Sequence, residues 1–150
     1  MKPVANFKKD LLRGKAAEDR FLQLYPNLKK LDGYKGDFML PDGRKLELKS
    51  DHYSPFKWSN VIIERYGSAT KNGGPWQAKD HGCDIFAYWF CNHDLLLLYP
   101  IDKLIELVEN LVVEQNIPLE DKINERHTTR FYRIKRIYLN NLLLDEDILK

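Results

Sequence analysis

The sequence predicts a single α/β domain over residues 1–150. Two segments with helical spacing of apolar residues, 6–25 and 100–115, stand on either side of several short strand-like segments, and the clearest of these form a hairpin within residues 36–51. A length of 150 residues suits one domain, and 43% hydrophobic residues are enough to form its core. The formal net charge is only +2, so overall charge points to no particular partner.

The composition also bears on the compartment. Cys83 and Cys91 are too few for a disulfide framework, and they have the character of small buried hydrophobic residues in a reducing cytoplasm. The N-terminus has no apolar signal segment, and no run of about 18 apolar residues occurs. We therefore expect a cytoplasmic protein that does not engage a membrane.

Residues 6–25 have the periodicity of a helix, which Pro26 ends. Glu18 falls at the centre of the apolar face, where a carboxylate is costly unless a cation or a hydrogen-bond donor meets it. We therefore expect a functional role for Glu18. Gly14 either breaks the helix or permits close approach of another backbone. The apolar face consists of Phe7, Leu11, Phe21, Leu22 and Tyr25.

A tight turn fixes the register of the hairpin. Residues 41–43 are Pro, Asp and Gly, which have the preferences of a three-residue turn with Gly43 in the left-handed conformation. This turn pairs Phe38 with Leu46 and directs both side chains into a core. A short strand at residues 28–31 is expected to lead into the hairpin.

Charged residues gather on the other face of the hairpin. In the predicted register Asp37 lies opposite Glu47, and the period of two places Lys49 on the same side. Glu18 is carried toward them by its helix, and clustered carboxylates stay ionised together only around a cation. Oxygen ligands suit Mg²⁺, with Mn²⁺ as a substitute, whereas the Cys and His spacing of a zinc site is absent. Lys49 would position an attacking water or stabilise the transition state.

Residues 60–66 are expected to form a third strand of the same sheet. Glu64 shares a face of that strand with Ile62, so it is an accessory site residue if that face carries Glu47, and otherwise a surface residue. Residues 67–82 are polar and rich in glycine, which suggests a mobile flap with one helical turn near Pro75.

Lysines of this expected flap have two interpretations. Lys71 and Lys79 are candidate phosphate contacts, although exposed lysines on a loop are usually only solubilising. Beyond the flap, residues 84–90 and 94–99 are apolar and form a predicted hairpin buried in the sheet. Pro100 then opens the amphipathic helix that ends near Gln115.

The segment at 125–139 fits a strand and a helix equally well. It interleaves basic and aromatic residues, which suits a DNA backbone because Arg and Lys neutralise phosphates. An edge strand protected from aggregation by its charges explains the pattern nearly as well. The candidate DNA-binding residues here are Arg126, Arg130, Arg133, Lys135 and Arg136.

The charged residues of the hairpin resemble the signature of the PD-(D/E)XK nuclease superfamily. Asp37 matches its first acid, and Glu47-x-Lys49 matches its second acid and its lysine. Glu18 matches the glutamate that many members carry on an upstream helix. Gly36 stands where the motif has proline, a frequent substitution in such families that leaves the chemistry untouched.

This resemblance implies a restriction-endonuclease-like fold, with an αβββαβ core in which helices flank a central mixed sheet. It also implies a metal-dependent endonuclease that acts on DNA. Asp37, Glu47 and the carbonyl group of Leu48 would hold the metal. Glu18 would bind it directly or through water, and Lys49 would assist the nucleophile.

The resemblance leaves the form of the DNA open. A site-specific enzyme of the homing or restriction type, acting in the cytoplasm of a bacterial or phage-infected cell, is the first expectation. A structure-specific nuclease such as a Holliday junction resolvase, or a DNA-binding module without activity, is the alternative. One such site cuts one strand, so cleavage of double-stranded or branched DNA favours a homodimer or a higher homo-oligomer.

Overall fold

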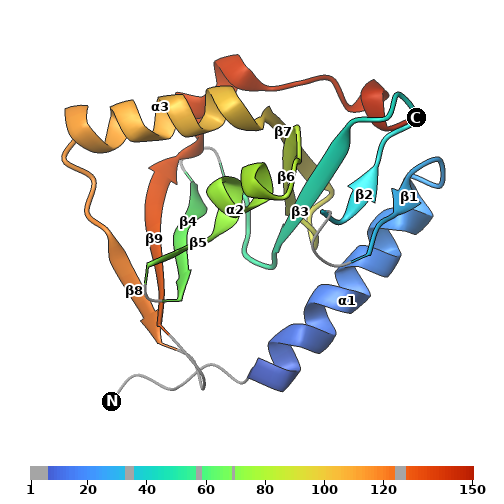
Figure 1. Cartoon of the computed structure of the whole chain (residues 1–150), viewed down its shortest axis with the longest axis horizontal. Helices are drawn as coiled ribbons and strands as arrows, with labels where there is room; N and C mark the ends of the chain where they lie inside the picture. Colours follow the sequence, from blue (N-terminus) through green and yellow to red (C-terminus); the bar gives the residue numbers. More distant parts are fainter. Residues whose placement is uncertain (1–6, 33–35, 57–58, 69, 124–127) are drawn as a thin grey trace.

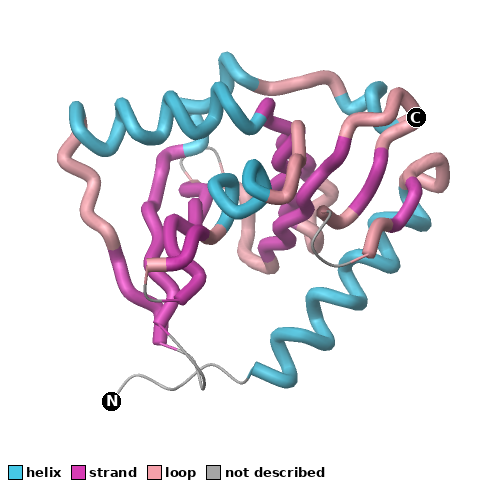
Figure 2. Tube along the Cα trace, in the orientation of Figure 1, coloured by secondary structure: helices cyan, strands magenta, loops and turns pink. Residues whose placement is uncertain are grey.

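A computed structural model describes residues 7–32, 36–56, 59–68, 70–123 and 128–150, with side chains from residue 12 onward. The chain is an α/β structure with two sheets (Figures 1 and 2). The mixed sheet contains, in this order, β1 (Lys29–Lys30), β2 (Phe38–Met39), β3 (Lys45–Asp51), β6 (Ile85–Phe90) and β7 (Leu95–Pro100). The antiparallel sheet contains β5 (Lys71–Asn72), β4 (Asn60–Ser68), β9 (Thr128–Lys135) and β8 (Glu120–Ile123). The helices are α1 (Phe7–Leu24), α2 (Gly74–Asp80) and α3 (Ile101–Glu114), with short 3-10 helices η2 (Arg136–Leu142) and η3 (Glu146–Leu149).

The predicted hairpin is formed by β2 and β3. Phe38 pairs with Leu46, and Met39 pairs with Lys45, as the turn chemistry requires. Gly43 adopts the left-handed conformation with a φ of 92°. The predicted register is therefore confirmed as far as Phe38, where β2 begins. The short strand expected at 28–31 is also present, as β1.

The other neighbour of β3 is the parallel strand β6. All residues of β6 are buried, because the mixed sheet is covered on both faces. The register places Glu47 beside Phe86 and Lys49 beside Tyr88. Residues paired in this way project from the same face of a sheet, so the charged side chains of β3 share a face with these aromatic rings.

Each face of the mixed sheet has its own hydrophobic core. On one face α1 and η3 pack against β3 and β6, with Phe21 and Trp89 in the centre. Full burial of a ring such as that of Phe21 stabilises the fold by about 2 kcal/mol relative to exposure. On the other face Tyr88 packs with Val61 of the antiparallel sheet and Leu104 of α3. Figure 1 shows α1 along one side of the mixed sheet and the antiparallel sheet on the other, so the charged face of β3 looks toward the antiparallel sheet.

The strand at residues 60–66 exists as part of β4, but it does not join the sheet of the hairpin. The expectation of a third strand beside the hairpin is therefore wrong. The place beside β3 is taken by β6, whose entirely apolar sequence needs cover on both faces. β4 has a half-exposed face and pairs with β9 instead, from Asn60 with Lys135 to Tyr66 with Arg130.

The expectation of a loop-like flap at residues 67–82 is also wrong over the described positions. The helix expected near Pro75 is present as α2, although it spans seven residues where a single turn was expected, and the preceding residues form β5, which pairs with β4. Pro75, Trp76 and Ala78 are buried. The glycines give this segment the composition of a loop, whereas its few apolar residues anchor it in the core between β4 and α3.

The remaining helices agree with the sequence. α1 runs through Gly14 without a break, and a methyl group at this position would meet no atom within 4 Å. α3 begins after Pro100 and ends at Glu114, with Leu104, Val108 and Leu111 of its apolar stripe buried. The ambiguous segment is a strand, β9, followed by η2. Cys83 and Cys91 are both buried thiols. Among the described residues, no helix has the length and apolar character that a membrane crossing requires.

Candidate active site

Asp37 lies immediately before β2, where the pairing of the hairpin ends. Its backbone amide donates to the carbonyl oxygen of Leu46 at 3.0 Å, so Asp37 is not paired directly opposite Glu47 as the sequence predicted. Its carboxylate instead accepts a hydrogen bond from the backbone amide of Leu48 at 2.7 Å. This bond holds the carboxylate against β3, at the part of the strand that β2 leaves uncovered.

Glu18 reaches Asp37 from α1. The carboxyl groups of Glu18 and Asp37 are hydrogen-bond partners. Burial raises the pKa of each group above its ordinary value. The charge of Asp37 raises the pKa of Glu18 further, while Lys30 opposes the rise from 3.8 Å away. The amide of Leu48 opposes the rise at Asp37. Glu18 thus has both a polar partner and a cation, which its place among apolar neighbours requires.

Glu47 completes a cluster of three carboxyl groups. Burial raises its pKa to about 8, and the negative charges of Asp37 and Glu18 contribute to the rise. The three groups come from three separate places in the chain, namely α1, the residue before β2, and β3. At neutral pH such a cluster retains protons unless a cation enters it.

Glu47 also borders a small cavity of about 90 Å³ between the two sheets. Lys49 lines the same cavity, as the period of two along β3 predicted. In the described part of the chain no ion pair involves Lys49. The rest of the lining consists of Leu48, Ile62, Glu64, Gly74, Gln77 and Phe86.

Glu64 belongs to this cavity rather than to a separate surface. Its Oε2 accepts a hydrogen bond from the backbone amide of Gly74 at 3.1 Å. A side chain on Gly73 would place its Cβ 2.5 Å from the same oxygen, so the glycine leaves the space that Glu64 occupies. Glu64 therefore lies on the other sheet, not on the face that carries Glu47, and both residues border the same cavity.

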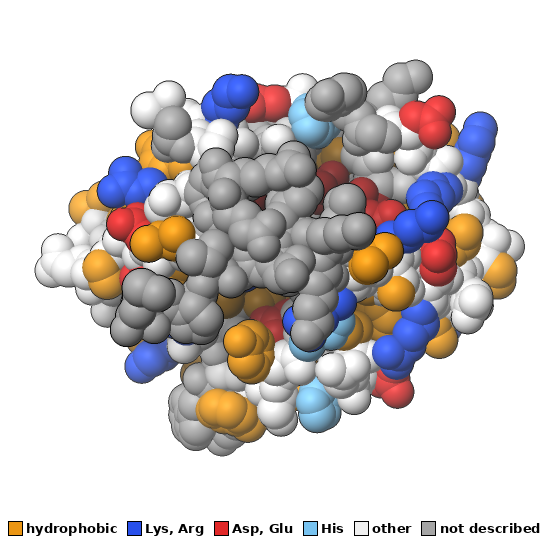
Figure 3. Space-filling model, turned by 90° about the horizontal axis from the view of Figure 1, so that it is seen from below, with side chains coloured by type: hydrophobic (Ala, Val, Ile, Leu, Met, Phe, Trp, Pro, Cys, Tyr) orange, Lys and Arg blue, Asp and Glu red, His pale blue; other side chains and the backbone are white. Residues whose placement is uncertain are grey.

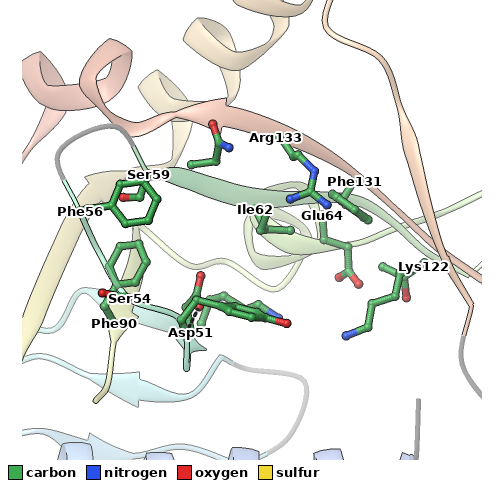
Figure 4. Close-up of a pocket in the computed structure, with 14 residues that line it drawn as sticks. Asp51, Ser54, Phe56, Ser59, Ile62, Glu64, Phe90, Lys122, Phe131 and Arg133 are labelled. Carbon is green, nitrogen blue, oxygen red and sulfur yellow. Dashed lines mark hydrogen bonds between the residues drawn. The ribbon is translucent and has the colours of Figure 1, made fainter. Parts of the chain in front are cut away.

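A larger cavity of about 560 Å³ adjoins the small one and shares Lys49, Ile62 and Glu64 with it. Figure 4 shows it between the end of β3 and the antiparallel sheet, with Lys122 and Arg133 reaching in from β8 and β9. In the space-filling view of Figure 3, acidic side chains line a hollow, with basic and hydrophobic side chains beside it. The larger cavity is also lined by Asp51, Tyr53, Ser54, Phe56, Ser59, Asn60, Phe90, Thr129 and Phe131.

A buried hydrogen-bonded link joins the two sheets at the floor of the larger cavity. The hydroxyl of Tyr88, on β6, donates to the carboxylate of Asp51 and accepts from the backbone amide of Ile62 at 3.2 Å. Burial and the bond to Asp51 raise the pKa of Tyr88 far above its ordinary value, so the hydroxyl remains a donor. Asp51 also accepts from the amide of Tyr53 at 2.8 Å. The end of β3 is thereby fixed relative to β4.

The two arginines predicted to contact DNA from the middle of β9 are both ion-paired with β8. Arg133 pairs with Glu120 at 2.9 Å, and Arg130 pairs with Asp121 at 3.0 Å. Only Arg133 of these two lines the larger cavity. Alternation along β9 explains the difference, because successive side chains point to opposite faces of the sheet.

The other predicted cations that the structure describes line neither of the two cavities. Lys79 pairs with Asp102 at 3.1 Å, which holds its ammonium group beside α3. Arg126 lies outside the described residues. Three more border neither of the two cavities: Lys71, Lys135 and Arg136.

The acidic cluster suits a hard divalent cation by its chemistry. It offers carboxylate oxygens, which Mg²⁺ prefers. Burial and the charges of Asp37 and Glu18 raise the pKa of Glu47, and a bound cation would offset both effects. Within the described ranges, no set of three or more His, Cys, Asp or Glu side chains forms a ready-made metal cage. Mg²⁺ does not require one, because it keeps several waters and often uses one or two carboxylates.

Sequence reasoning did not find three of the residues around the site. Asp51 carries a signal that would have found it, since the period of two places it on the face of Glu47 and Lys49. Ser59 and Lys122 carry no such signal. They reach the cavity only because the antiparallel sheet packs against the mixed one.

Comparisons with family models, with curated proteins and with solved structures found no match. The functional interpretation therefore depends on the residues of this site and on their geometry.

Proposed function

We propose that this chain is a metal-dependent DNA endonuclease that hydrolyses phosphodiester bonds. The observation that carries the proposal is the cluster of Glu18, Asp37 and Glu47, in which burial and the charges of Asp37 and Glu18 raise the pKa of Glu47 to about 8. Lys49 lies beside Glu47 on the wall of a cavity, as the nuclease motif requires. Surface carboxylates without a function would not be expected to gather from three segments into a partly buried group.

The order of the elements supports the same assignment. The chain has the order of an αβββαβ core in α1, in the strands β1, β2 and β3, and then in α2 and β6. β3 and β6 are parallel neighbours connected through α2. The strands β4 and β5 interrupt this order, and in our proposal they are an addition to a restriction-endonuclease-like core.

Asp37 and Glu47 are the proposed metal ligands, with Glu18 binding directly or through water. The amide of Leu48 points to Asp37, and the amide and carbonyl groups of a strand residue point to the same side, so the carbonyl of Leu48 faces the same gap. Bound Mg²⁺ would supply a Lewis acid that activates water and neutralises charge on a phosphoryl oxygen.

Lys49 has a role that the carboxylates cannot perform. Its ammonium group, on the wall next to Glu47, would orient the attacking water or offset the negative charge that develops at phosphorus. Lys122 and Arg133, in the adjoining cavity, would contact neighbouring phosphates and thereby position the strand.

Cleavage assays with several DNA substrates test this function. Supercoiled plasmid, a four-way junction and linear duplex are each incubated with the protein, in Mg²⁺ and in chelator. We expect metal-dependent cutting of the closed plasmid, because an endonuclease needs no free end. Discrete fragments would support the site-specific form, and junction cutting would support the structure-specific form. Absence of any metal-dependent product would contradict the proposal.

A second measurement bears on the assembly. One site cuts one strand, so cleavage of both strands is expected to need two copies of the chain. Sedimentation of the protein with and without DNA would reveal such a dimer or higher homo-oligomer.

A further inference from the structure

We propose that the larger cavity receives an unpaired nucleobase of the DNA substrate, next to the phosphate that is cut. The inference rests on the proposed nuclease function and names its substrate: DNA that presents an unstacked base, either at a flap or by flipping out of a duplex. The lining of the cavity, its polar groups and its position beside the acidic cluster each support it.

The size and the aromatic lining suit a base. A cavity of about 560 Å³ lies in the range of small-molecule sites, which measure roughly 300–1,000 Å³. Phe56 and Tyr53 are 64% and 81% exposed at this cavity, although both are large aromatic residues. Phe131 lies deeper, and the guanidinium group of Arg133 stands 5.4 Å from the centre of its ring. Aromatic and guanidinium surfaces are the platforms on which unpaired bases stack.

Polar groups of the cavity are available to the edge of a base. The hydroxyl of Ser59 is buried, with the residue only 7% exposed, and has no hydrogen-bond partner among the described residues. Burial of such a group is costly unless a partner arrives. Figure 4 shows Ser59 beside Phe56 in the cavity, and the amide of Asn60 lines it as well. A base carries both donors and acceptors on its edge, so it can supply the missing partner.

The charges of the cavity fit a nucleotide rather than a neutral aromatic ligand. Lys122 lines the cavity, and none of the ion pairs between described residues involves it. Lys49 and Glu64 belong to both cavities, so the larger one begins where the proposed catalytic cavity ends. A nucleotide whose phosphate lies near Lys49 therefore has its base beside Phe56 and Ser59, whereas Phe131, which pairs with Glu64, lies at the other end of the cavity (Figure 4).

A base stacked in a continuous duplex cannot reach the buried hydroxyl of Ser59 in this cavity. Enzymes that hold a base in a pocket act on single strands or extrude the base from the helix, at the cost of unstacking it. We therefore expect flapped DNA to bind more tightly than the same duplex without a flap. Base–aromatic stacking corresponds to about a tenfold or larger difference in affinity.

The test measures binding separately from cleavage. The Glu47→Gln protein is titrated in chelator with two DNA substrates. The first is a duplex with a short flap that contains 2-aminopurine. The second is the same duplex without the flap, with 2-aminopurine at an internal, paired position. Phe56→Ala and Ser59→Ala are added to this background, because Phe56 is exposed and the loss of one hydroxyl is a small change. Tyr138→Ala, a 42% exposed ring on η2, is the matched control.

We expect the flapped duplex to bind about tenfold more tightly than the duplex without a flap, with a change in 2-aminopurine emission. Phe56→Ala should remove this preference, and Tyr138→Ala should retain it. A change in emission from the internal 2-aminopurine that Phe56→Ala abolishes would also support the inference, through a flipped base. Equal affinity for the two substrates with unchanged emission would overturn it.

The wild-type chain with Mg²⁺ and the same substrates tests the nuclease function independently. A flap preference without any cleavage would support the base site and overturn the proposed nuclease. Cleavage without a flap preference or an emission change would overturn the base site alone.

Discussion

The carboxylate of Asp37 accepts a 2.7 Å hydrogen bond from the backbone amide of Leu48. This bond connects the residue before β2 to the strand that carries Glu47, so the relative position of the two acids depends on backbone as well as on side-chain conformation. Asp37 needs an acceptor oxygen for this structural role, whereas the proposed metal site needs its negative charge. The two roles are separable by substitution.

Asp37→Asn keeps a carbonyl oxygen for the amide of Leu48 and removes the charge that repels Glu47. We expect the free energy of unfolding at pH 8 to remain equal or rise, while Mg²⁺-dependent cleavage falls by at least about 100-fold, as it does when other electrostatic groups of active sites are removed. Asp37→Ala also loses the acceptor and should cost about 1–3 kcal/mol of stability. Urea unfolding and plasmid cleavage measure the two effects.

Asp94→Asn is the matched control for this substitution, because Asp94 is exposed and pairs only loosely with Arg20, at 3.4 Å. It should alter neither stability nor cleavage appreciably. If Asp37→Asn retained full cleavage, the negative charge of Asp37 would have no role in catalysis.

The raised pKa of Glu47 predicts how stability depends on pH. Between its ordinary value of 4.5 and about 8, the folded chain holds a proton that the unfolded chain has lost. The contribution of Glu47 to the free energy of unfolding is therefore complete at low pH and is lost as pH rises through this range. The effect is on the order of a few kcal/mol, since one pKa unit corresponds to about 1.4 kcal/mol. The raised pKa of Glu18 acts in the same direction.

Thermal melts from pH 5 to 8 in chelator test this dependence. Glu47→Gln should flatten the profile, because its side chain is neutral at every pH. Mg²⁺ should restore stability to the wild type at pH 8, since metal competes with protons for the carboxylates, and should do so less for the variant. Parallel profiles for the two proteins would show that Glu47 keeps an ordinary pKa.

Tyr88→Phe tests the link between the sheets. The substitution leaves the carboxylate of Asp51 and the amide of Ile62 without the partner that the hydroxyl supplies. We expect a loss of about 1–3 kcal/mol in the free energy of unfolding by urea. Tyr138→Phe, on an exposed ring, should change it little. Equal stability of the two variants would mean that the link does not hold the sheets together.

Two glycines should respond in opposite ways to substitution by alanine. Gly14→Ala lies within α1 with no atom nearby, so it should stabilise the chain by about 0.5–1 kcal/mol. Gly74 has a positive φ of 47°, and a Cβ there would collide with the backbone carbonyl of Glu64. Gly74→Ala should therefore lower the melting temperature and displace Glu64. Similar melting temperatures for both variants would contradict this.

The elements that the sequence predicted correctly are determined by residues that are close together in the chain. The turn at 41–43 determines which residues of β2 and β3 are paired, and Gly43 supplies the conformation that closes it. α1 and α3 follow from apolar spacing. Glu18 was identified because a carboxylate in an apolar stripe needs a partner, and the structure supplies Asp37.

The rest depends on contacts between distant segments. The alternation of apolar and polar residues in β4 does not determine which strand it pairs with. Asn60 pairs with Lys135, which is distant in the sequence. The same pairing creates the larger cavity, so Ser59 and Lys122 could not be connected to Glu47 from sequence. The buried position of Trp76 likewise overrode the loop-like composition of residues 67–82.

The most direct test of the nuclease proposal compares four proteins on supercoiled plasmid in Mg²⁺ and in chelator: wild type, Glu47→Ala, Lys49→Ala and Lys103→Ala. Lys103 is exposed on α3 and serves as the control for the loss of a lysine. We predict that wild type and Lys103→Ala cut the plasmid only with Mg²⁺, while Glu47→Ala and Lys49→Ala still retard DNA in a gel and do not cut it. Unchanged cleavage by either Glu47→Ala or Lys49→Ala, or cleavage by the wild type in chelator, would contradict the proposal.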